Sequence, residues 1–126
     1  MAGEKILLIE DDLFLHDLYR DTLKNAGYIV VSARDGEAGL KLIKENIDGK
    51  LVLLDLMLPK MNGIDVLKEM KKDEATRNQS VIVLTNLSED NIIKEALRLG
   101  ANAYLVKVDF TPQEVIDTVR QYIDLR

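Results

Sequence analysis

Short runs of apolar residues alternate along this chain with longer segments in which apolar residues recur every three or four positions. Runs of four or five apolar residues bounded by turn formers are typical of strands buried on both faces, whereas the longer spacing is typical of helices that bury one face. The runs predict strands at 5–9, 28–31, 51–54, 81–84 and 103–106. The periodic segments predict helices at 15–26, 35–46, 64–72, 88–99 and 111–123, and the polar segment 73–80 predicts a loop.

Helix boundaries are marked by residues with known terminal preferences. Gly27 and Gly100 follow the last apolar positions of the first and fourth helices, where glycine commonly ends a helix. Asp35 and Ser88 stand where a side chain can accept hydrogen bonds from the first free backbone N–H groups. Residues 111–114, Thr-Pro-Gln-Glu, combine a capping box with proline at the first helical position, and so predict where the last helix begins.

The strict alternation of strands and helices predicts an α/β fold, with a parallel sheet between two layers of helices. Right-handed crossover connections leave few arrangements for five such units. We expect a three-layer, doubly wound (βα)5 sheet with the flavodoxin-like strand order 2-1-3-4-5, because the most uniformly apolar strands are then central. No repeat or linker interrupts the pattern, so residues 1–126 are expected to form a single domain. In such a sheet the site lies beyond the carboxyl ends of the first and third strands.

Composition narrows the range of partners. The 126 residues include 17 basic and 22 acidic side chains, giving a net charge of −5, which argues against nonspecific binding to nucleic acid. An apolar fraction of 47% is ordinary for a folded domain, and the chain has no cysteine for disulfide or thiol chemistry. It has neither a signal-peptide pattern nor an apolar stretch of membrane-spanning length. We therefore expect a cytoplasmic domain that binds neither nucleic acid nor membrane.

Polar residues follow the predicted strands at the edge where the site is expected. Glu10 and Asp11 follow the first strand, Asp55 the third, Thr85 the fourth and Lys107 the fifth. Three carboxylates at one switch point repel one another unless a cation joins them, and hard oxygen ligands on rigid strand ends suit Mg²⁺. Lys107 and Thr85 could then hold the oxygens of a phosphoryl group, with Asp55 as the nucleophile that accepts it. The sequence thus predicts a phosphoryl-accepting aspartate.

A flavin or nucleotide site on the same fold is a poorer interpretation. Such a site needs a loop rich in Ser, Thr or Gly after the first strand, and residues 10–12, Glu-Asp-Asp, would repel a phosphate there. The chain also has no P-loop or dinucleotide-binding glycine pattern. Asp12 is interpreted as a charge or cap at the start of the first helix.

Four segments resemble a known family in their order and spacing. They are residues 6–12 (Ile-Leu-Leu-Ile-Glu-Asp-Asp), 55–63 (Asp-Leu-Met-Leu-Pro-Lys-Met-Asn-Gly), 81–85 (Val-Ile-Val-Leu-Thr) and 100–107 (Gly-Ala-Asn-Ala-Tyr-Leu-Val-Lys). Together they resemble the receiver domain of two-component response regulators, of the chemotaxis-regulator type, over essentially the whole chain.

This resemblance implies a role for each site residue. Asp55 would be the phosphoacceptor, and Glu10, Asp11, Asp55 and the backbone carbonyl of Met57 would surround Mg²⁺. Thr85 and Lys107 would contact the phosphoryl group, and Tyr104 would change rotamer as Thr85 is drawn inward. On the residues alone, a static half-buried aromatic ring is an equally good interpretation of Tyr104.

The resemblance also implies a phosphorylation switch in a two-component phosphorelay, which catalyses only its own phosphoryl transfer and dephosphorylation. A histidine kinase, a phosphotransfer protein or a small phosphodonor would supply the phosphoryl group. A downstream output protein or domain would read the surface formed by the fourth helix, fifth strand and fifth helix. A homodimer formed on phosphorylation is a further partner to test.

Two alternatives remain open. The first is a receiver-like adaptor that binds proteins without being phosphorylated; the loop at 108–110 is its only support. The second is a hydrolase with an aspartyl nucleophile, such as those of the haloacid-dehalogenase group. That class needs a second aspartate two residues after the nucleophile, where Met57 stands.

The chain departs from the family pattern at two places. The family usually follows its lysine with a proline in a cis bond, whereas Lys107 is followed by Val108-Asp109-Phe110. We expect a trans bond before Val108, since the cis form costs about 3–4 kcal/mol without proline, and a remodelled loop. Whether Asp109 adds negative charge to the site is a question for the structure. The second departure is Asn86, where the family most often has alanine.

Other side chains are assigned to packing or to the surface. His16 is the only histidine and lies inside the first helix, so we interpret it as a helix-face residue rather than a phosphotransfer group. Tyr19, Tyr28 and Tyr122 are interpreted as packing residues.

Overall fold

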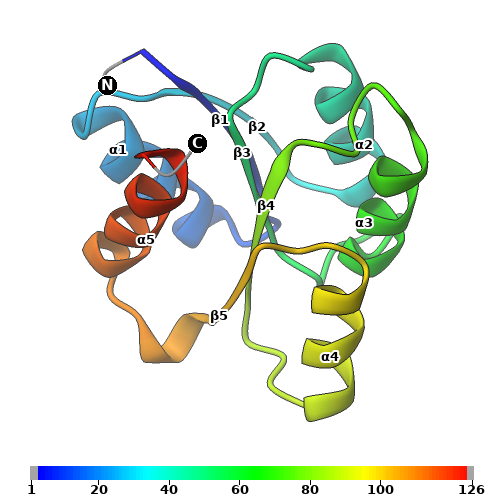
Figure 1. Ribbon diagram of the computed structural model, residues 1–126. Helices are drawn as coiled ribbons and strands as arrows, with labels where there is room; N and C mark the ends of the chain where they lie inside the picture. Colours follow the sequence, from blue (N-terminus) through cyan, green and yellow to red (C-terminus); the bar gives the residue numbers. More distant parts are fainter. Residues whose placement is uncertain (1–2, 125–126) are drawn as a thin grey trace.

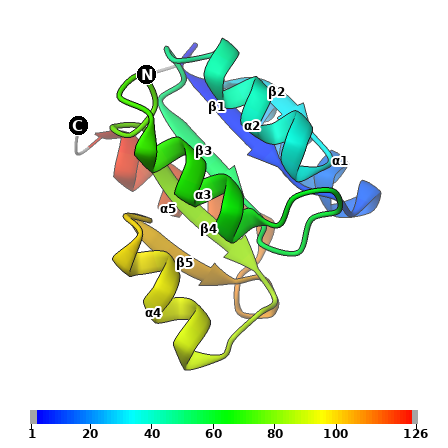
Figure 2. The same ribbon diagram turned by 90° about the vertical axis from the view of Figure 1, so that its right-hand side faces the viewer.

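The computed structural model describes residues 3–124, in which strands and α-helices alternate. The strands are β1 (Lys5–Ile9), β2 (Ile29–Ala33), β3 (Leu51–Leu54), β4 (Ser80–Thr85) and β5 (Ala103–Val106). The helices are α1 (Leu13–Asn25), α2 (Gly36–Glu45), α3 (Gly63–Lys72), α4 (Asp90–Arg98) and α5 (Pro112–Asp124), with a single 3-10 turn, η1 (Lys107–Asp109), between β5 and α5. The strands pair in parallel in the order β2-β1-β3-β4-β5 and run in one direction (Figure 2). The predicted fold class and strand order are confirmed.

Helices cover both faces of the sheet. In Figure 1, α1 and α5 lie on one side of it and α2, α3 and α4 on the other. Because successive strand residues point to opposite faces, Ile6 and Leu8 pack with α1 and α5, whereas Leu7 and Ile9 pack with α2 and α3. The same alternation divides β3 and β4 between the two cores. The central strands therefore need apolar residues at every position, which explains their continuous apolar runs.

Most predicted helix boundaries agree with the structure. Asp35 caps α2 by accepting a hydrogen bond from the Ala38 N–H at 2.7 Å. Thr111 and Glu114 form both bonds of the capping box, at 2.8 and 3.1 Å. Gly27 and Gly100 have φ angles of +99° and +111°, a conformation that L-residues rarely adopt, and each follows the C-cap residue of its helix, α1 or α4.

The predicted Ser88 cap is wrong. Helix α4 begins at Asp90, and its N-cap residue is Glu89, which makes no capping hydrogen bond with its side chain. The backbone of Leu87 makes two hydrogen bonds that hold the preceding loop. Its carbonyl accepts from the Tyr104 hydroxyl, and its N–H donates to the Thr85 hydroxyl oxygen. A local capping pattern does not include the bond from Tyr104, which lies 17 residues from Leu87 in sequence. The second strand also begins one residue later than predicted, at Ile29, and continues to Ala33.

Within residues 3–124, no helix is both long enough and apolar enough to cross a membrane.

Candidate functional site

The carboxyl ends of β1, β3, β4 and β5 bring the predicted polar residues to one edge of the sheet. β1 is followed directly by Glu10, β3 by Asp55 and β5 by Lys107, while Thr85 is the last residue of β4. These strands are neighbours in a parallel sheet, so their carboxyl ends meet although the residues lie far apart in sequence. Glu10, Asp55 and Thr85 are buried, with exposed fractions of 2%, 5% and 0%.

Lys107 joins the two buried carboxylates. Its Nζ lies 2.7 Å from Glu10 Oε1 and 2.8 Å from Asp55 Oδ2. The second oxygen of each carboxylate accepts a backbone N–H: Glu10 Oε2 from Asp12 at 3.0 Å, and Asp55 Oδ1 from Met57 at 3.1 Å. The carboxyl end of the sheet therefore buries two carboxylates against one ammonium group, which leaves this trio with one negative charge in excess.

The environment changes the pKa values of Glu10 and Lys107. Burial raises the pKa of Glu10, and the neighbouring Lys107 offsets only part of that effect. Burial by itself lowers the pKa of Lys107, but the hydrogen bonds to Asp55 and Glu10 outweigh it and hold that pKa above its usual value. Lys107 therefore stays protonated at neutral pH and supplies a fixed positive charge beside Asp55.

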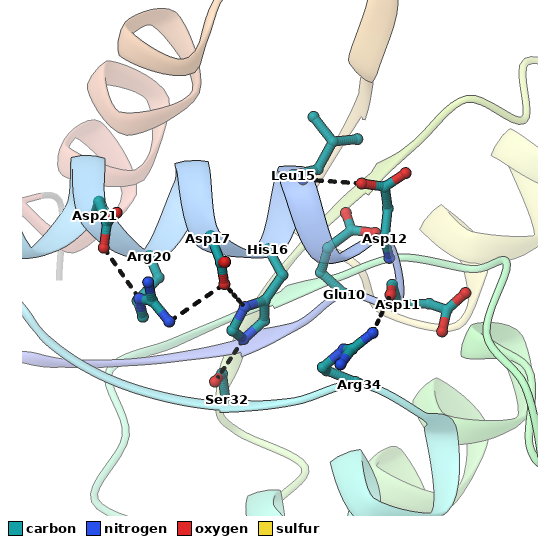
Figure 3. A network of polar contacts seen from close by, with 10 residues as sticks. All are labelled: Glu10, Asp11, Asp12, Leu15, His16, Asp17, Arg20, Asp21, Ser32 and Arg34. Carbon is teal, nitrogen blue, oxygen red and sulfur yellow. Dashed lines mark hydrogen bonds and ion pairs between the residues drawn. The ribbon is translucent and has the colours of Figure 1, made fainter.

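Asp11 and Asp12 differ from Glu10 in exposure and in role (Figure 3). Both are exposed. The backbone carbonyl of Asp11 accepts from Arg34 at 3.4 Å, while its carboxylate makes no hydrogen bond or ion pair within residues 3–124. Asp12 caps α1 by accepting from the Leu15 N–H at 2.9 Å, which agrees with its predicted role as a cap.

The donor set suits a hard cation, although the three predicted carboxylates do not form a ready-made cluster. Among residues 3–124, no three acidic, histidine or cysteine side chains are arranged to hold a metal ion. Glu10 and Asp55 are instead bridged by Lys107, and Asp11 leaves its carboxylate to solvent. Oxygen donors with excess negative charge and one exposed carboxylate at the rim fit a Mg²⁺ ion that keeps several of its waters.

Thr85 and Tyr104 meet at the backbone of Leu87. The Thr85 hydroxyl accepts from the Leu87 N–H at 3.5 Å, and the Tyr104 hydroxyl donates to the Leu87 carbonyl at 2.6 Å. Tyr104 is partly buried, and this burial raises the pKa of its hydroxyl. A movement of the loop that begins at Thr85 would therefore act directly on the hydrogen bond of Tyr104.

The loop after Asp55 is held close to α2 and α3. A Cβ atom on Gly63 would collide with the backbone of Asp55 and Leu56, and the Gly36 N–H donates to the Pro59 carbonyl at 3.1 Å. Asn62 caps α3 by accepting a hydrogen bond from the Asp65 N–H at 3.0 Å. Sequence patterns do not reveal the close approach of Gly63, because it depends on packing against the loop backbone.

The predicted remodelling after Lys107 is present. Residues 107–109 form the turn η1, and the peptide bonds of the described residues are all trans. The Val108 N–H donates to Asn86 Oδ1 at 3.2 Å, so the two departures from the family pattern contact each other. Asp109 is exposed and makes no ion pair within residues 3–124. Lys107 nevertheless reaches both carboxylates.

His16 lies away from this edge in a polar network of its own (Figure 3). It is only 6% exposed, and its ring nitrogens lie 2.9 Å from Asp17 Oδ1 and 2.8 Å from Ser32 Oγ. The residue is therefore buried between α1 and β2, rather than on an open helix face. Sequence reasoning missed this role because the partner Ser32 comes from a strand.

Comparisons with known proteins agree with this arrangement. The model of the response regulator receiver domain family matches residues 6–120. The chain is 40% identical to the transcriptional regulatory protein CpxR of Escherichia coli (strain K12) over 116 residues, which are 92% of this chain and 47% of that protein. It is 35% identical to sporulation initiation phosphotransferase F of Bacillus subtilis (strain 168), over 100% of this chain and 98% of that protein.

Solved structures agree as well. A CheY-like response regulator receiver domain protein from Methanospirillum hungatei JF-1 has a TM-score of 0.89 and 26% identity, over 98% of this chain and 95% of its own. The chain spans about half the length of the curated relatives it matches first, at 47% and 49%. By its sequence and its fold, the chain belongs to the response regulator receiver domain family.

Proposed function

We propose that the domain is a phosphorylation switch in a two-component phosphorelay and that Asp55 accepts the phosphoryl group. The observation on which this rests is the pairing of Lys107 with Asp55 and Glu10 at the carboxyl end of the sheet. Asp55 is the carboxylate that follows the central strand β3, beside a protonated lysine, and the neighbouring strand β4 ends in the buried Thr85. A carboxylate oxygen so placed can attack phosphorus and form an acyl phosphate.

The protein groups divide the work of the transfer. An Asp55 oxygen forms the new O–P bond, while the P–N bond of a phosphohistidine, or the P–O bond of acetyl phosphate, breaks and its electron pair leaves with the donor. Lys107 turns from the carboxylates to the phosphoryl oxygens, and Thr85 donates its hydroxyl to another of them. Mg²⁺, held by Glu10, Asp11, Asp55 and the Met57 carbonyl, would neutralise the carboxylates and the phosphoryl oxygens.

The phosphoryl group would act on the rest of the domain through Leu87. Thr85 and Tyr104 both bond to the backbone of Leu87, so drawing Thr85 toward the phosphoryl group shifts the anchor of Tyr104. Added negative charge then changes the surface made by α4, β5 and α5. The partners are a histidine kinase or phosphotransfer protein that supplies the phosphoryl group, and an output protein or domain that reads this surface. The domain catalyses only its own phosphorylation and dephosphorylation.

The direct test is labelling by acetyl phosphate in the presence of Mg²⁺, followed by intact-mass spectrometry. Asp55→Asn should abolish labelling, because an amide does not act as the nucleophile, and chelation of Mg²⁺ should have the same effect on the wild-type protein. Asp35→Asn is a matched control, since Asp35 also follows a strand but caps α2. Normal labelling of Asp55→Asn would show that a different residue accepts the group.

Beryllofluoride separates the switch from the adaptor. Binding of beryllofluoride to the wild-type protein should require Mg²⁺ and should be lost in Asp55→Asn. A wild-type protein that binds none under these conditions would support the adaptor, whereas turnover of an added phosphoester would support the hydrolase.

A further inference from the structure

Asn86 and Val108 join the two loops that hold the proposed phosphoryl contacts. Asn86 directly follows Thr85, and Val108 directly follows Lys107. The last paired residues of β4 and β5 are Thr85 and Val106, so the backbone ladder ends at this point. The hydrogen bond from the Val108 N–H to Asn86 Oδ1, 3.2 Å long, adds one more connection between the two chains beyond that ladder.

The backbone at Lys107 must be well placed for its side chain to reach Asp55. β5 is an edge strand of the sheet, and β4 lies between it and β3. Neighbouring strands are about 4.8 Å apart, so the contact between Lys107 and Asp55 has to pass over β4, and the contact with Glu10 over β3 as well. Its Nζ nevertheless lies within 2.8 Å of Asp55 and 2.7 Å of Glu10. The place of the ammonium group between the two carboxylates therefore depends on where the backbone holds Lys107.

Two hydrogen bonds fix the backbone on the far side of Lys107. The Phe110 N–H donates to the Lys107 carbonyl at 3.2 Å and closes the turn η1. The second is the bond from Val108 to Asn86. The Val108 side chain is 79% exposed, so packing of that side chain does little to hold the turn in place. A proline at position 108 would have no N–H to donate, so the bond needs the Asn86 side chain and a residue other than proline at position 108.

We propose that Asn86 is a positioning residue for phosphoryl transfer, acting through the Val108 backbone to hold Lys107 on Asp55. This inference rests on the proposed function of Asp55. Because Asn86 also follows Thr85, the same bond ties the loop that presents the hydroxyl to the loop that presents the ammonium group. The two phosphoryl contacts therefore move together, and loss of the bond weakens both without removing either group.

The chain contains a matched bond at the other end of the same strand pair. Asn102 Oδ1 accepts from the Val81 N–H at 2.8 Å, so an asparagine side chain again links β4 to the segment next to β5. Asn102 and Asn86 are both exposed. The Asn102 bond lies at the amino end of the sheet, far from Asp55, and so provides a control for any general loosening of the β4–β5 pair.

The experiment compares rates of labelling by acetyl phosphate at saturating Mg²⁺ in Asn86→Ala, Asn102→Ala, Val108→Pro and the double variant Asn86→Ala/Val108→Pro. Losing one net hydrogen bond's contribution to positioning should slow Asn86→Ala roughly threefold to tenfold. Val108→Pro should slow labelling to a similar degree, and the double variant should be no slower than the single ones, because all three lack the same bond. Asn102→Ala should be labelled at the wild-type rate.

Two further measurements distinguish positioning from a structural role. Val108→Ala keeps the N–H and should be labelled at the wild-type rate. The Val108 amide should exchange slowly with solvent in the wild-type protein and faster in Asn86→Ala, while the affinity for Mg²⁺ stays unchanged. Equal rates in Asn86→Ala and the wild-type protein, or additive losses in the double variant, would overturn the inference and leave the role of Asp55 intact. A wild-type protein that is not labelled would overturn the proposed function itself, and this inference with it.

Discussion

Lys71 and Lys107 are partly buried lysines at opposite ends of the sheet, and they bond to different kinds of acceptor. Lys71, from α3, donates to the backbone carbonyls of Arg77 and Gln79 at 2.9 and 3.2 Å, just before β4 begins. Lys107 donates to the side chains of Glu10 and Asp55. Burial lowers the pKa of Lys71, whereas the two carboxylates keep the pKa of Lys107 above its usual value in spite of burial.

The two fully buried threonines show the same contrast. Thr76, at the amino end of the sheet, donates its hydroxyl to the Met70 carbonyl at 2.7 Å. Thr85, at the carboxyl end, only accepts a long 3.5 Å bond from the Leu87 N–H. The hydroxyl of Thr76 thus has a strong and permanent partner, whereas the hydrogen of the Thr85 hydroxyl remains available to a new acceptor.

The contrast separates polar groups that stabilise the fold from those that can change partners. At the amino end, buried polar side chains satisfy backbone carbonyls, which do not titrate and stay in place. Gln79 belongs to this group, since its amide donates to the carbonyls of Asn46 and Gly49 at 3.0 and 3.4 Å. At the carboxyl end, charged side chains satisfy one another, so an incoming anion or cation can replace Lys107 as their partner while the backbone N–H groups that bond to Glu10 and Asp55 keep their acceptors.

Replacing each lysine by methionine tests this contrast and gives the largest expected effect on labelling. Lys107→Met should slow labelling by acetyl phosphate about 100-fold, because it removes the ammonium group that faces the transferred phosphoryl oxygens. Lys71→Met should be labelled at the wild-type rate, and should lower the free energy of unfolding because two carbonyls lose their donor. Labelling kinetics and urea denaturation of the two variants provide the measurements. A comparable loss of labelling in both variants would show that the two ends of the sheet do not divide these roles.

Replacing each threonine by valine keeps the shape of the side chain, and its expected effect on labelling is smaller than that of the lysine variants. Thr85→Val should slow labelling about tenfold, because one hydrogen bond to a charged phosphoryl oxygen is lost, while stability changes little. Thr76→Val should lower the free energy of unfolding by about 1 kcal/mol and leave labelling unchanged, since the Met70 carbonyl loses its buried donor. The contrast would fail if Thr85→Val destabilised the domain as much as Thr76→Val does.

Sequence reasoning located the carboxyl-end groups because the fold itself places them. The apolar runs define parallel strands, and the residue after each run must then lie at one edge, which is why Glu10, Asp55 and Lys107 could be predicted to meet. The capping box at residues 111–114 was equally predictable, because its two bonds are local.

Contacts that involve loops and turns could not be predicted in the same way. Lys71 lies on the polar face of a helix, and its carbonyl acceptors come from a turn without any periodic pattern. The bond between Asn86 and Val108 joins two loops, so it depends on how both leave the sheet. Ser88 resembles a helix cap by composition, but Glu89 takes the extended conformation, with ψ at 134°, and α4 begins after it. In each case a tertiary contact outweighs a local preference.

Alkaline titration should show the smallest effect and a difference in sign between the two lysines. The pKa of Lys107 is raised in the folded protein, so the stability that Lys107 contributes is complete below the unfolded value of 10.5 and falls as the pH rises above it. The pKa of Lys71 is lowered, so its ionisation penalises the folded state, and that penalty disappears as the pH rises toward 10.5. We therefore expect the stability of the wild-type protein relative to Lys107→Met to fall above pH 10.5, and its stability relative to Lys71→Met to rise as the pH approaches that value. Urea denaturation between about pH 9 and pH 11 would measure both differences in the free energy of unfolding. If both differences changed with pH in the same direction, the assignment of carboxylate partners to Lys107 and carbonyl partners to Lys71 would be contradicted.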